Sequence, residues 1–570
     1  MRTNPKSSFM AAVVASLARH GKAASIDLGW HAPNATAINN LTRVVSGEGI
    51  YGFIYNNSNT PADEYGIYNW CNMPHVRKTE YEVPSSEYKL QYVEVIHRHH
   101  KRTVYASNSF PVESYGWNCD DEGLFYYGQP KGSNKSAHAY WQGLLSPQNP
   151  FVPTGFLGTC QFPQITAGGL DDSWQHGQDL YGVYHDLLGF LPEDMGEKVT
   201  FRVTQNVITS EVAGMVINGM FNTQADVPLL VEPSGYDSLE PTYTCTVSSN
   251  LFNAIKSGTN WTSHLTAATS LYATLDNISG VSPADSGFHA SFDHYYDNLS
   301  ARQCHAKPLP CKLVNGVNST TCVTQDIADE VYRFGNYEYS YIYRDDYRSL
   351  AASATSFGVW IGELTTHLRA SIAGNSSVVY RHNVAHDGSM SRLLSVLQLD
   401  VMVWPGMGSE VVFELYKKET SATPTATTMV TATASVIAPN CNHDNCLRQF
   451  IGASSAASAF CPTFTASANV SLPTFASNCD GDASRVSSAC SCLVTPTSTG
   501  SAPTSTGTAG TSASGYYIRV LWGGKVLRSS NPSLGLMDMV PVETVLAYFD
   551  GLAGFGASLV YGKCNGTIPV

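Results

Sequence analysis

The sequence predicts an α/β protein in which helices flank a sheet, and three observations indicate this class. Strand-like segments alternate with helical or polar segments along most of the chain. The 570 residues, 43% of them hydrophobic, are enough for one large core and a smaller one. A Ser/Thr-rich stretch then interrupts this pattern late in the chain. Ligands of α/β sheets bind beyond the carboxyl ends of strands, so polar residues at those ends are the first site candidates.

Three strand-to-helix units support the prediction. Residues 88–96 ("YKLQYVEVI") read as a strand that leads into "HRHHKR". Residues 198–204 read as a second strand, and the apolar spacing of 206–221 predicts a helix behind it. Residues 377–384 read as a third strand, followed by "AHDGSMSRLLSVLQLD", in which we expect Ser389 to cap a helix.

Late in the chain, two strand-like segments enclose a low-complexity stretch. "EVVFELYKK" precedes it and "GYYIRVLWGGKVL" follows it, as expected of a hairpin whose tip has received an insertion. We therefore assign residues 25–419 and 516–570 to one domain and 420–515 to Ser/Thr-rich linkers. The linkers enclose a cysteine-rich module, residues 441–492, whose disulfide pairing stays open. Zinc at Cys441, His443 and Cys446 is a less favoured alternative.

Several features predict secretion to the cell exterior or cell wall. Residues 1–24 resemble a signal peptide, with a short buried helix as the alternative. The chain has 14 cysteines and many Asn-x-Ser/Thr sites, such as Asn260, Asn298 and Asn469, which favour an oxidised glycoprotein. We expect no membrane span, because no apolar run reaches the required length. A net charge of −13 disfavours nucleic acid as a partner.

The segment "HRHHKR" allows three interpretations. It could be a solvated basic turn, which is what most such clusters are. It could bind a metal through His97, His99 and His100, but neighbouring side chains of an extended segment point to opposite faces, and arginines repel cations. It could instead present His99 as a nucleophile between Arg98 and Arg102, whose guanidinium groups suit phosphoryl oxygens.

On the third interpretation the chain resembles the histidine acid phosphatases, branch two of the histidine phosphatase superfamily, of the fungal secreted type. "RHHKRTV" keeps the Arg, His and second Arg of their Arg-His-Gly-x-Arg-x-Pro motif but departs from it at His100 and Val104. "HD" at 386–387 resembles their later His-Asp pair, and Arg202 matches their third arginine. The resemblance implies a phosphoglycerate-mutase-like mixed sheet flanked by helices, with a helical subdomain.

The resemblance also implies a mechanism that uses no metal or other cofactor. His99 would attack a phosphate monoester and Asp387 would protonate the leaving alkoxide. The phosphoryl group would be bound by Arg98, Arg102, Arg202 and His386. We expect an acidic optimum, because positive neighbours keep His99 unprotonated while Asp387 gains its proton at mildly acidic pH.

Small phosphorylated compounds are the substrates that this mechanism implies. A broad phosphatase is favoured over a phytase or inositol polyphosphate phosphatase, because acidic residues (46) outnumber Lys and Arg (33). Two further alternatives are a metal-dependent phosphohydrolase that uses His386 and Asp387 as ligands, and a catalytically silent extracellular glycoprotein or binding protein.

Overall fold

The computed structural model describes residues 26–52, 54, 65–419 and 512–570, apart from gaps within 114–162 and at residue 224, together with scattered residues between 436 and 494. The predicted signal peptide, residues 1–24, and most of the module 441–492 lie outside the described residues. The chain divides into one unit of residues 1–420 and 507–570 and a second of residues 421–506.

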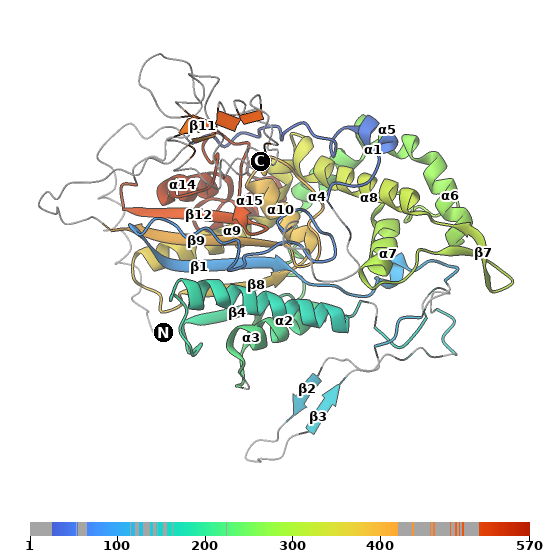
Figure 1. Cartoon of the computed structure of the whole chain (residues 1–570), viewed down its shortest axis with the longest axis horizontal. Coiled ribbons are helices and arrows are strands. Elements are labelled where there is room, and N and C mark those ends of the chain that lie inside the picture. Colours follow the sequence, from blue (N-terminus) through green and yellow to red (C-terminus); the bar gives the residue numbers. More distant parts are fainter. Residues whose placement is uncertain are drawn as a thin grey trace, which may run out of the picture. The chain divides into compact units, whose positions relative to one another are not determined.

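A mixed sheet organises the first unit (Figure 1). Its strand order is β13-β12-β9-β1-β8-β4-β5, and β14 also pairs with β12. The strands β1, β8, β4 and β5 are parallel, whereas β9 and β12 run antiparallel to their neighbours. The strands are β1 (Tyr88–Arg98), β4 (Val199–Val203), β5 (Leu229–Val231), β8 (Tyr380–Ala385), β9 (Glu410–Lys418), β12 (Tyr516–Trp522), β13 (Lys525–Val526) and β14 (Val540–Pro541).

Helices cover both faces of this sheet, which gives the mixed α/β architecture that the sequence predicts (Figure 1). One face packs on α2 and α3, and the other packs on α9, α10 and α14. These helices are α2 (Ala167–Tyr181), α3 (Val207–Phe221), α9 (Ser349–Ile372), α10 (Asp387–Val396) and α14 (Val542–Ala553). Two apolar cores therefore form, one on each face of the sheet.

Further helices enclose a separate aromatic core that contains Trp70, Trp261, Tyr296 and Phe334. These helices are α1 (Leu41–Ser46), α4 (Thr246–Lys256), α5 (Thr259–Ala267), α6 (Thr269–Ser279), α7 (Asp293–Cys304) and α8 (Gln325–Ser340). The chain ends in α15 (Val560–Asn565). Short two-stranded sheets are β2 (Phe125–Gly128) with β3 (Ala137–Tyr140), and β6 (Cys311–Val314) with β7 (Val317–Cys322).

The three predicted strands are confirmed, but only the second and third lead directly into a helix, because β1 is followed by a long segment in which the described residues form no α-helix before α2. The first, second and third predicted strands are β1, β4 and β8, and the predicted helix behind the second strand is α3. The expectation that Ser389 caps the third helix is wrong, because α10 begins at Asp387 and His386 occupies its N-cap position. The side chain of Ser389 instead donates to the carbonyl of Leu239 at 2.6 Å.

The two strands that enclose the insertion pair with each other. Tyr516 lies opposite Lys417 and Trp522 opposite Val411, so β9 and β12 form an antiparallel pair across about a hundred intervening residues. In the second unit, β10 (Val436–Ile437) pairs with β11 (Leu493–Val494), and a disulfide joins Cys461 to Cys490.

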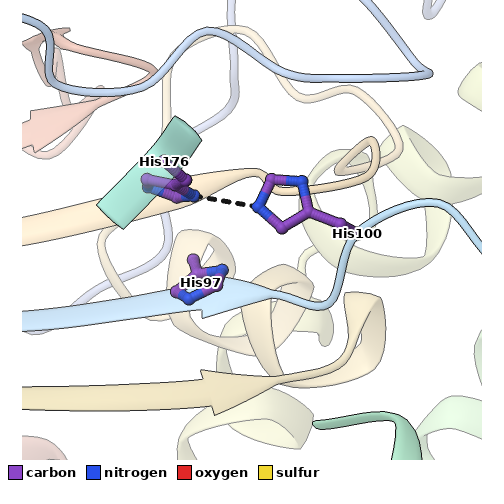
Figure 2. A group of neighbouring side chains, drawn as sticks. All are labelled: His97, His100 and His176. Atoms are coloured by element: carbon purple, nitrogen blue, oxygen red, sulfur yellow. Dashed lines mark hydrogen bonds between the residues drawn. The ribbon is translucent and has the colours of Figure 1, made fainter. Parts of the chain in front are cut away.

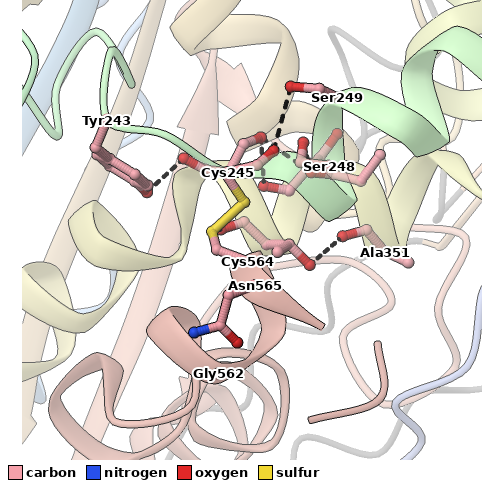
Figure 3. Close-up of a disulfide and its surroundings, with 12 residues drawn as sticks. Tyr243, Cys245, Ser248, Ser249, Ala351, Gly562, Cys564 and Asn565 are labelled. Atoms are coloured by element: carbon pink, nitrogen blue, oxygen red, sulfur yellow. Dashed lines mark hydrogen bonds between the residues drawn. A yellow bond between two sulfur atoms is a disulfide. The ribbon is translucent and has the colours of Figure 1, made fainter. Parts of the chain in front are cut away.

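Disulfides close several loops of the first unit. The longest of those described joins Cys245, which precedes α4, to Cys564 in α15 across 319 positions (Figure 3). The others are Cys71–Cys304, Cys119–Cys160 and Cys311–Cys322. These bonds are consistent with a secreted protein.

The described residues bear on the expected membrane span and on one glycosylation site. None of the described helices is long and apolar enough to cross a membrane. Asn298 is 2% exposed, and its side chain bonds to Asn108 and Arg302. Because a glycan needs an accessible asparagine, this Asn-x-Ser/Thr site is not a glycosylation site in the folded chain.

Candidate active site

The site begins where the parallel strands β1 and β8 end side by side. Arg98 lies in register with Ala385, so the next residue on each strand, His99 and His386, emerges at the same edge of the sheet. The backbone N–H of His99 donates to the carbonyl of Ala385 at 3.0 Å. The two imidazole rings lie 5.4 Å apart between centroids. The two motifs are therefore brought together by strand pairing.

His99 has a defined tautomer. Its Nδ1 lies 3.0 Å from the carbonyl oxygen of His100, which can only accept a hydrogen bond, so Nδ1 carries the proton. The lone pair of the neutral ring is then on Nε2. The ring is 2% exposed. Burial, followed by the charges of Arg98 and Arg102, lowers the pKa of His99 well below its usual value, so the imidazole stays neutral at mildly acidic pH.

Arg98 and Arg102 supply positive charge on either side of this ring. Arg98 donates to the carbonyl of Pro405 at 2.7 Å and forms an ion pair with Asp387 at 3.2 Å. Arg102 forms an ion pair with Asp297 at 3.0 Å. In both arginines the buried Nε–H has no hydrogen-bond partner among the described residues. Each guanidinium group therefore keeps a donor for an anion.

Asp387 is the first residue of α10, and its side chain remains 25% exposed. One carboxylate oxygen accepts from the backbone N–H of Gly388 at 2.8 Å, and the other accepts from the indole N–H of Trp404 at 2.9 Å. Burial alone would raise the pKa of Asp387, but Arg98, the Trp404 hydrogen bond and Arg102 outweigh it and lower that pKa. The ligand-free site thus holds a carboxylate, contrary to the expectation that mild acidity is enough to protonate it.

His386 lies between a hydroxyl and a second carboxyl group. Its Nε2 is 2.9 Å from Oγ1 of Thr204 and 3.3 Å from Glu240. Burial lowers the pKa of His386 to about 4, despite the opposing charge of Asp387. Burial, followed by the charges of Asp237 and Asp387, raises the pKa of Glu240 to about 7. Glu240 is thus a proton-carrying group beside the site at mildly acidic pH.

Arg202 bonds to carboxylates and a hydroxyl rather than to the other predicted residues. Arg202 lies on β4, where its guanidinium group donates to Glu363 at 2.6 Å, Glu232 at 2.5 Å and the Ser238 hydroxyl at 2.8 Å. Two carboxylates therefore already balance its charge. The expectation that Arg202 binds phosphate is not supported by these contacts.

His97 and His100 contact a different set of residues from His99. The Nε2 of His100 lies 3.0 Å from Nδ1 of His176 in α2, and His97 lies beside both rings (Figure 2). His99 instead contacts His386, so the prediction that His99 and His100 face opposite ways is confirmed. Burial and the neighbouring His176 lower the pKa of His97 to about 3.

Three residues of the site carried no signal in the sequence: Asp297, Glu240 and Trp404. Asp297 and Glu240 lie far along the chain from both motifs, Trp404 lies 17 positions after Asp387, and all three are residue types that are common on surfaces or in cores. The parallel pairing of β1 and β8 could be expected from the strand pattern. The packing of α7 and of the 404–410 turn against the site could not be expected from any local pattern.

Comparisons with known proteins give similarities of low identity. No family model matches the chain. Counting factor 60 of Dictyostelium discoideum is 24% identical over 345 residues, which are 58% of this chain and 77% of that protein. Among solved structures, the Klebsiella sp ASR1 phytase has a TM-score of 0.37 at 16% identity, and the match covers 59% of this chain and 80% of the phytase chain. The Bifidobacterium longum multiple inositol polyphosphate phosphatase, complexed with inositol hexasulfate, has a TM-score of 0.36 at 10% identity and covers 61% of this chain and 89% of its own.

Proposed function

We propose that the chain hydrolyses phosphate monoesters through a phosphohistidine intermediate on His99. The observation that carries this proposal is the state of the His99 ring: Nδ1 donates to a carbonyl, which leaves the Nε2 lone pair available beside Arg98 and Arg102. A neutral imidazole held next to two guanidinium groups is suited to attack phosphorus while the phosphoryl charge is stabilised.

The reaction has two balanced steps. Nε2 of His99 forms a bond to phosphorus as the P–O ester bond breaks, and the leaving alkoxide takes a proton from Asp387. A water molecule then attacks phosphorus and gives a proton to Asp387 as the N–P bond breaks, which releases inorganic phosphate. A bound phosphate dianion counteracts the charge of Arg98 and Arg102, and this raises the pKa of Asp387 toward the value that its role needs.

The charges of the site favour substrates with a single phosphate group. Arg98 and Arg102 are already paired with Asp387 and Asp297, and Lys101 is paired with Asp172 at 3.0 Å. An inositol polyphosphate would need further cations for its other phosphates. Rates on simple monoesters and on phytate between about pH 3 and about pH 7 distinguish the two classes. Faster turnover of phytate would reject the single-phosphate preference.

The decisive experiment traps the intermediate. Wild-type protein incubated with labelled p-nitrophenyl phosphate and quenched in base should carry one labelled phosphoryl group per chain, because phosphohistidine survives alkali and is lost in acid. His99→Ala should abolish both the label and turnover, a loss of at least about 10³-fold. His264→Asn is a matched control, because His264 is also fully buried but bonds to Glu338 away from the site.

Each rival function gives a different result. A metal-dependent phosphohydrolase built on His386 and Asp387 would turn over without a trapped phosphoryl group and would lose activity with chelator. A silent glycoprotein or binding protein would show no vanadate-sensitive hydrolysis that depends on His99. Secretion to the cell exterior or cell wall belongs to the same proposal and is checked by locating the expressed protein.

A further inference from the structure

We propose that His97, His100 and His176 form a binding site for one divalent transition metal ion, with zinc as the best-suited ion. His97 comes from β1, His100 from the segment just after it and His176 from α2, and the three imidazoles gather where these segments meet (Figure 2). All three side chains are fully buried, at 0% exposure. One nitrogen from each lies within 4.8 Å of the other two.

Two of the rings are held with a lone pair available to a metal. Nδ1 of His97 lies 2.8 Å from the carbonyl oxygen of Arg98 and must therefore donate, which leaves the lone pair on Nε2. Nε2 of His176 lies 2.9 Å from a carboxylate oxygen of Glu410, which orients Nδ1 as the other ligand. A carboxylate or carbonyl behind a histidine is the usual outer shell of a metal site.

His100 provides the third nitrogen. Its Nε2 is 3.0 Å from Nδ1 of His176, close to the separation of about 3.4 Å that Zn–N bonds of about 2.1 Å impose in a tetrahedral site. Metal binding would replace this N–H···N bond and move the His100 proton to Nδ1, a buried atom with no partner among the described residues. Nε2 of His97 also lies 2.8 Å from Nε2 of His382, and metal binding would replace this hydrogen bond as well, so the ion would have three protein ligands.

The charges around the cluster also favour a cation. Glu410 is 1% exposed, and neither of its carboxylate oxygens contacts a Lys or Arg among the described residues. The nearby His75, which stacks on His176, is already paired with Asp179 at 2.8 Å. A metal bound to three neutral imidazoles would give the buried Glu410 carboxylate the positive charge that it lacks.

The arginines that argued against a metal near His99 do not face this cluster. Arg98 pairs with Asp387, and Arg102 pairs with Asp297. Three histidines leave a fourth coordination position for a small ligand, and because the site is enclosed we expect the ion to stabilise the fold and hold the 97–102 segment in place.

The test measures metal content and stability rather than phosphatase activity. Full-length protein produced in zinc-containing medium should contain about one zinc per chain, measured by elemental analysis. After chelation, Co²⁺ should bind at the same stoichiometry and give the visible absorption bands of a tetrahedral nitrogen site. Added Zn²⁺ should raise the melting temperature of the stripped protein.

Variants locate the ion. His100→Gly should lose the metal and the zinc-dependent rise in melting temperature, because it removes a ligand without adding a side chain. His176→Gln tests a second ligand, and His264→Gln is the matched control, since it removes a buried carboxylate-bound histidine outside the cluster. Wild-type protein that binds neither Zn²⁺ nor Co²⁺ would overturn the proposal. Full metal content in His100→Gly would also overturn it, by placing the ion elsewhere, for example in the cysteine-rich module.

Discussion

At the residue scale, Asp387 and Glu240, the two carboxyl groups beside His386, have pKa values that are shifted in opposite directions. The pKa of Asp387 is lowered, with Arg98 and Trp404 outweighing burial, whereas burial raises the pKa of Glu240 to about 7. Below that pH, Glu240 is neutral and adds no negative charge to the site. Above it, Glu240 is a carboxylate 3.3 Å from His386 and repels an incoming phosphate. Glu240 is therefore expected to set the upper pH limit of activity.

This gives a prediction for Glu240→Gln. Wild-type kcat/KM on p-nitrophenyl phosphate should fall as the pH rises through about 7, the pKa of Glu240. The glutamine variant is uncharged at every pH, so its fall should be smaller by about three- to tenfold at pH 8. The measurement is kcat/KM across the pH range for both proteins, with Glu232→Gln as a control carboxylate. Superimposable profiles would contradict the role given to Glu240.

His100 and Gly408 also depend on each other, because the ring of one packs where a side chain on the other would lie. Gly408 has a φ of +69°, and its backbone N–H donates to the carbonyl of His99 at 3.0 Å. A Cβ at this position would lie 2.8 Å from Nδ1 of His100 and would contact Cε1 more closely still. The imidazole of His100 therefore occupies space that only glycine at 408 leaves free.

Gly408→Ala should consequently lower both stability and activity. We expect a loss of about 2–4 kcal/mol in the free energy of unfolding, from the positive φ and the clash together. In metal-free protein, where His100 contributes no metal bond, the double variant Gly408→Ala/His100→Gly removes the clash and keeps the φ cost, so it should recover part of that loss. Urea unfolding of the two single variants and the double variant measures the coupling. Additive effects would show that the ring and the glycine are independent.

The site residues that could be predicted from the sequence are those that belong to a recognisable motif at the end of a strand. His99 and His386-Asp387 follow strands, and their types suit phosphoryl chemistry, so both were predictable and the structure brings them together. Arg202 also follows this pattern, yet it is bound to Glu232 and Glu363. Nothing local in the sequence shows which carboxylates a strand residue will meet, because that depends on how α9 and the segment after β5 pack.

At the scale of elements, Arg202 joins β4 to α9 and to the segment after β5. Its partners Glu232 and Glu363 are 37% and 31% exposed, so water screens part of this attraction. This arrangement implies a structural role for Arg202, in contrast to the phosphate-binding role that the resemblance implies.

Arg202→Met separates the two roles. If the role is structural, the variant should lose about 1–2 kcal/mol of stability, while kcat/KM on p-nitrophenyl phosphate stays within about twofold of the wild type. Arg102→Met is the comparison, because Arg102 lies beside His99 and its loss should lower kcat/KM by at least about 10²-fold. A comparably large loss of activity in Arg202→Met would restore its assignment as a phosphate ligand.

At the scale of the whole molecule, some contacts between distant parts of the sequence could be predicted from sequence patterns and others could not. The pairing of β9 with β12 was predictable, because both segments are strand-like and only low-complexity sequence and a cysteine-rich stretch separate them. The packing of His176 against His100, with Glu410 behind His176, was not, since only the segment of His100 carries a motif and that motif does not indicate which residues will pack on it. Cysteine pairing was likewise open, because spacing alone does not choose among pairings.

The disulfides act mainly on the unfolded chain, and they differ in the length of the loop that each closes. Cys245–Cys564 closes a loop of 319 positions, whereas Cys311–Cys322 closes one of 11. Loop entropy grows with length, so the long link restricts the unfolded state more. Removing it should cost about 5–6 kcal/mol, against about 2–3 kcal/mol for the short one. Paired Cys→Ala variants at each site, compared by urea unfolding with the other bonds intact, measure both losses. If removal of Cys311–Cys322 costs as much stability as removal of Cys245–Cys564, the loop-entropy account is wrong. The position of α15 would then depend mainly on its packing against α9 and α4 rather than on the disulfide.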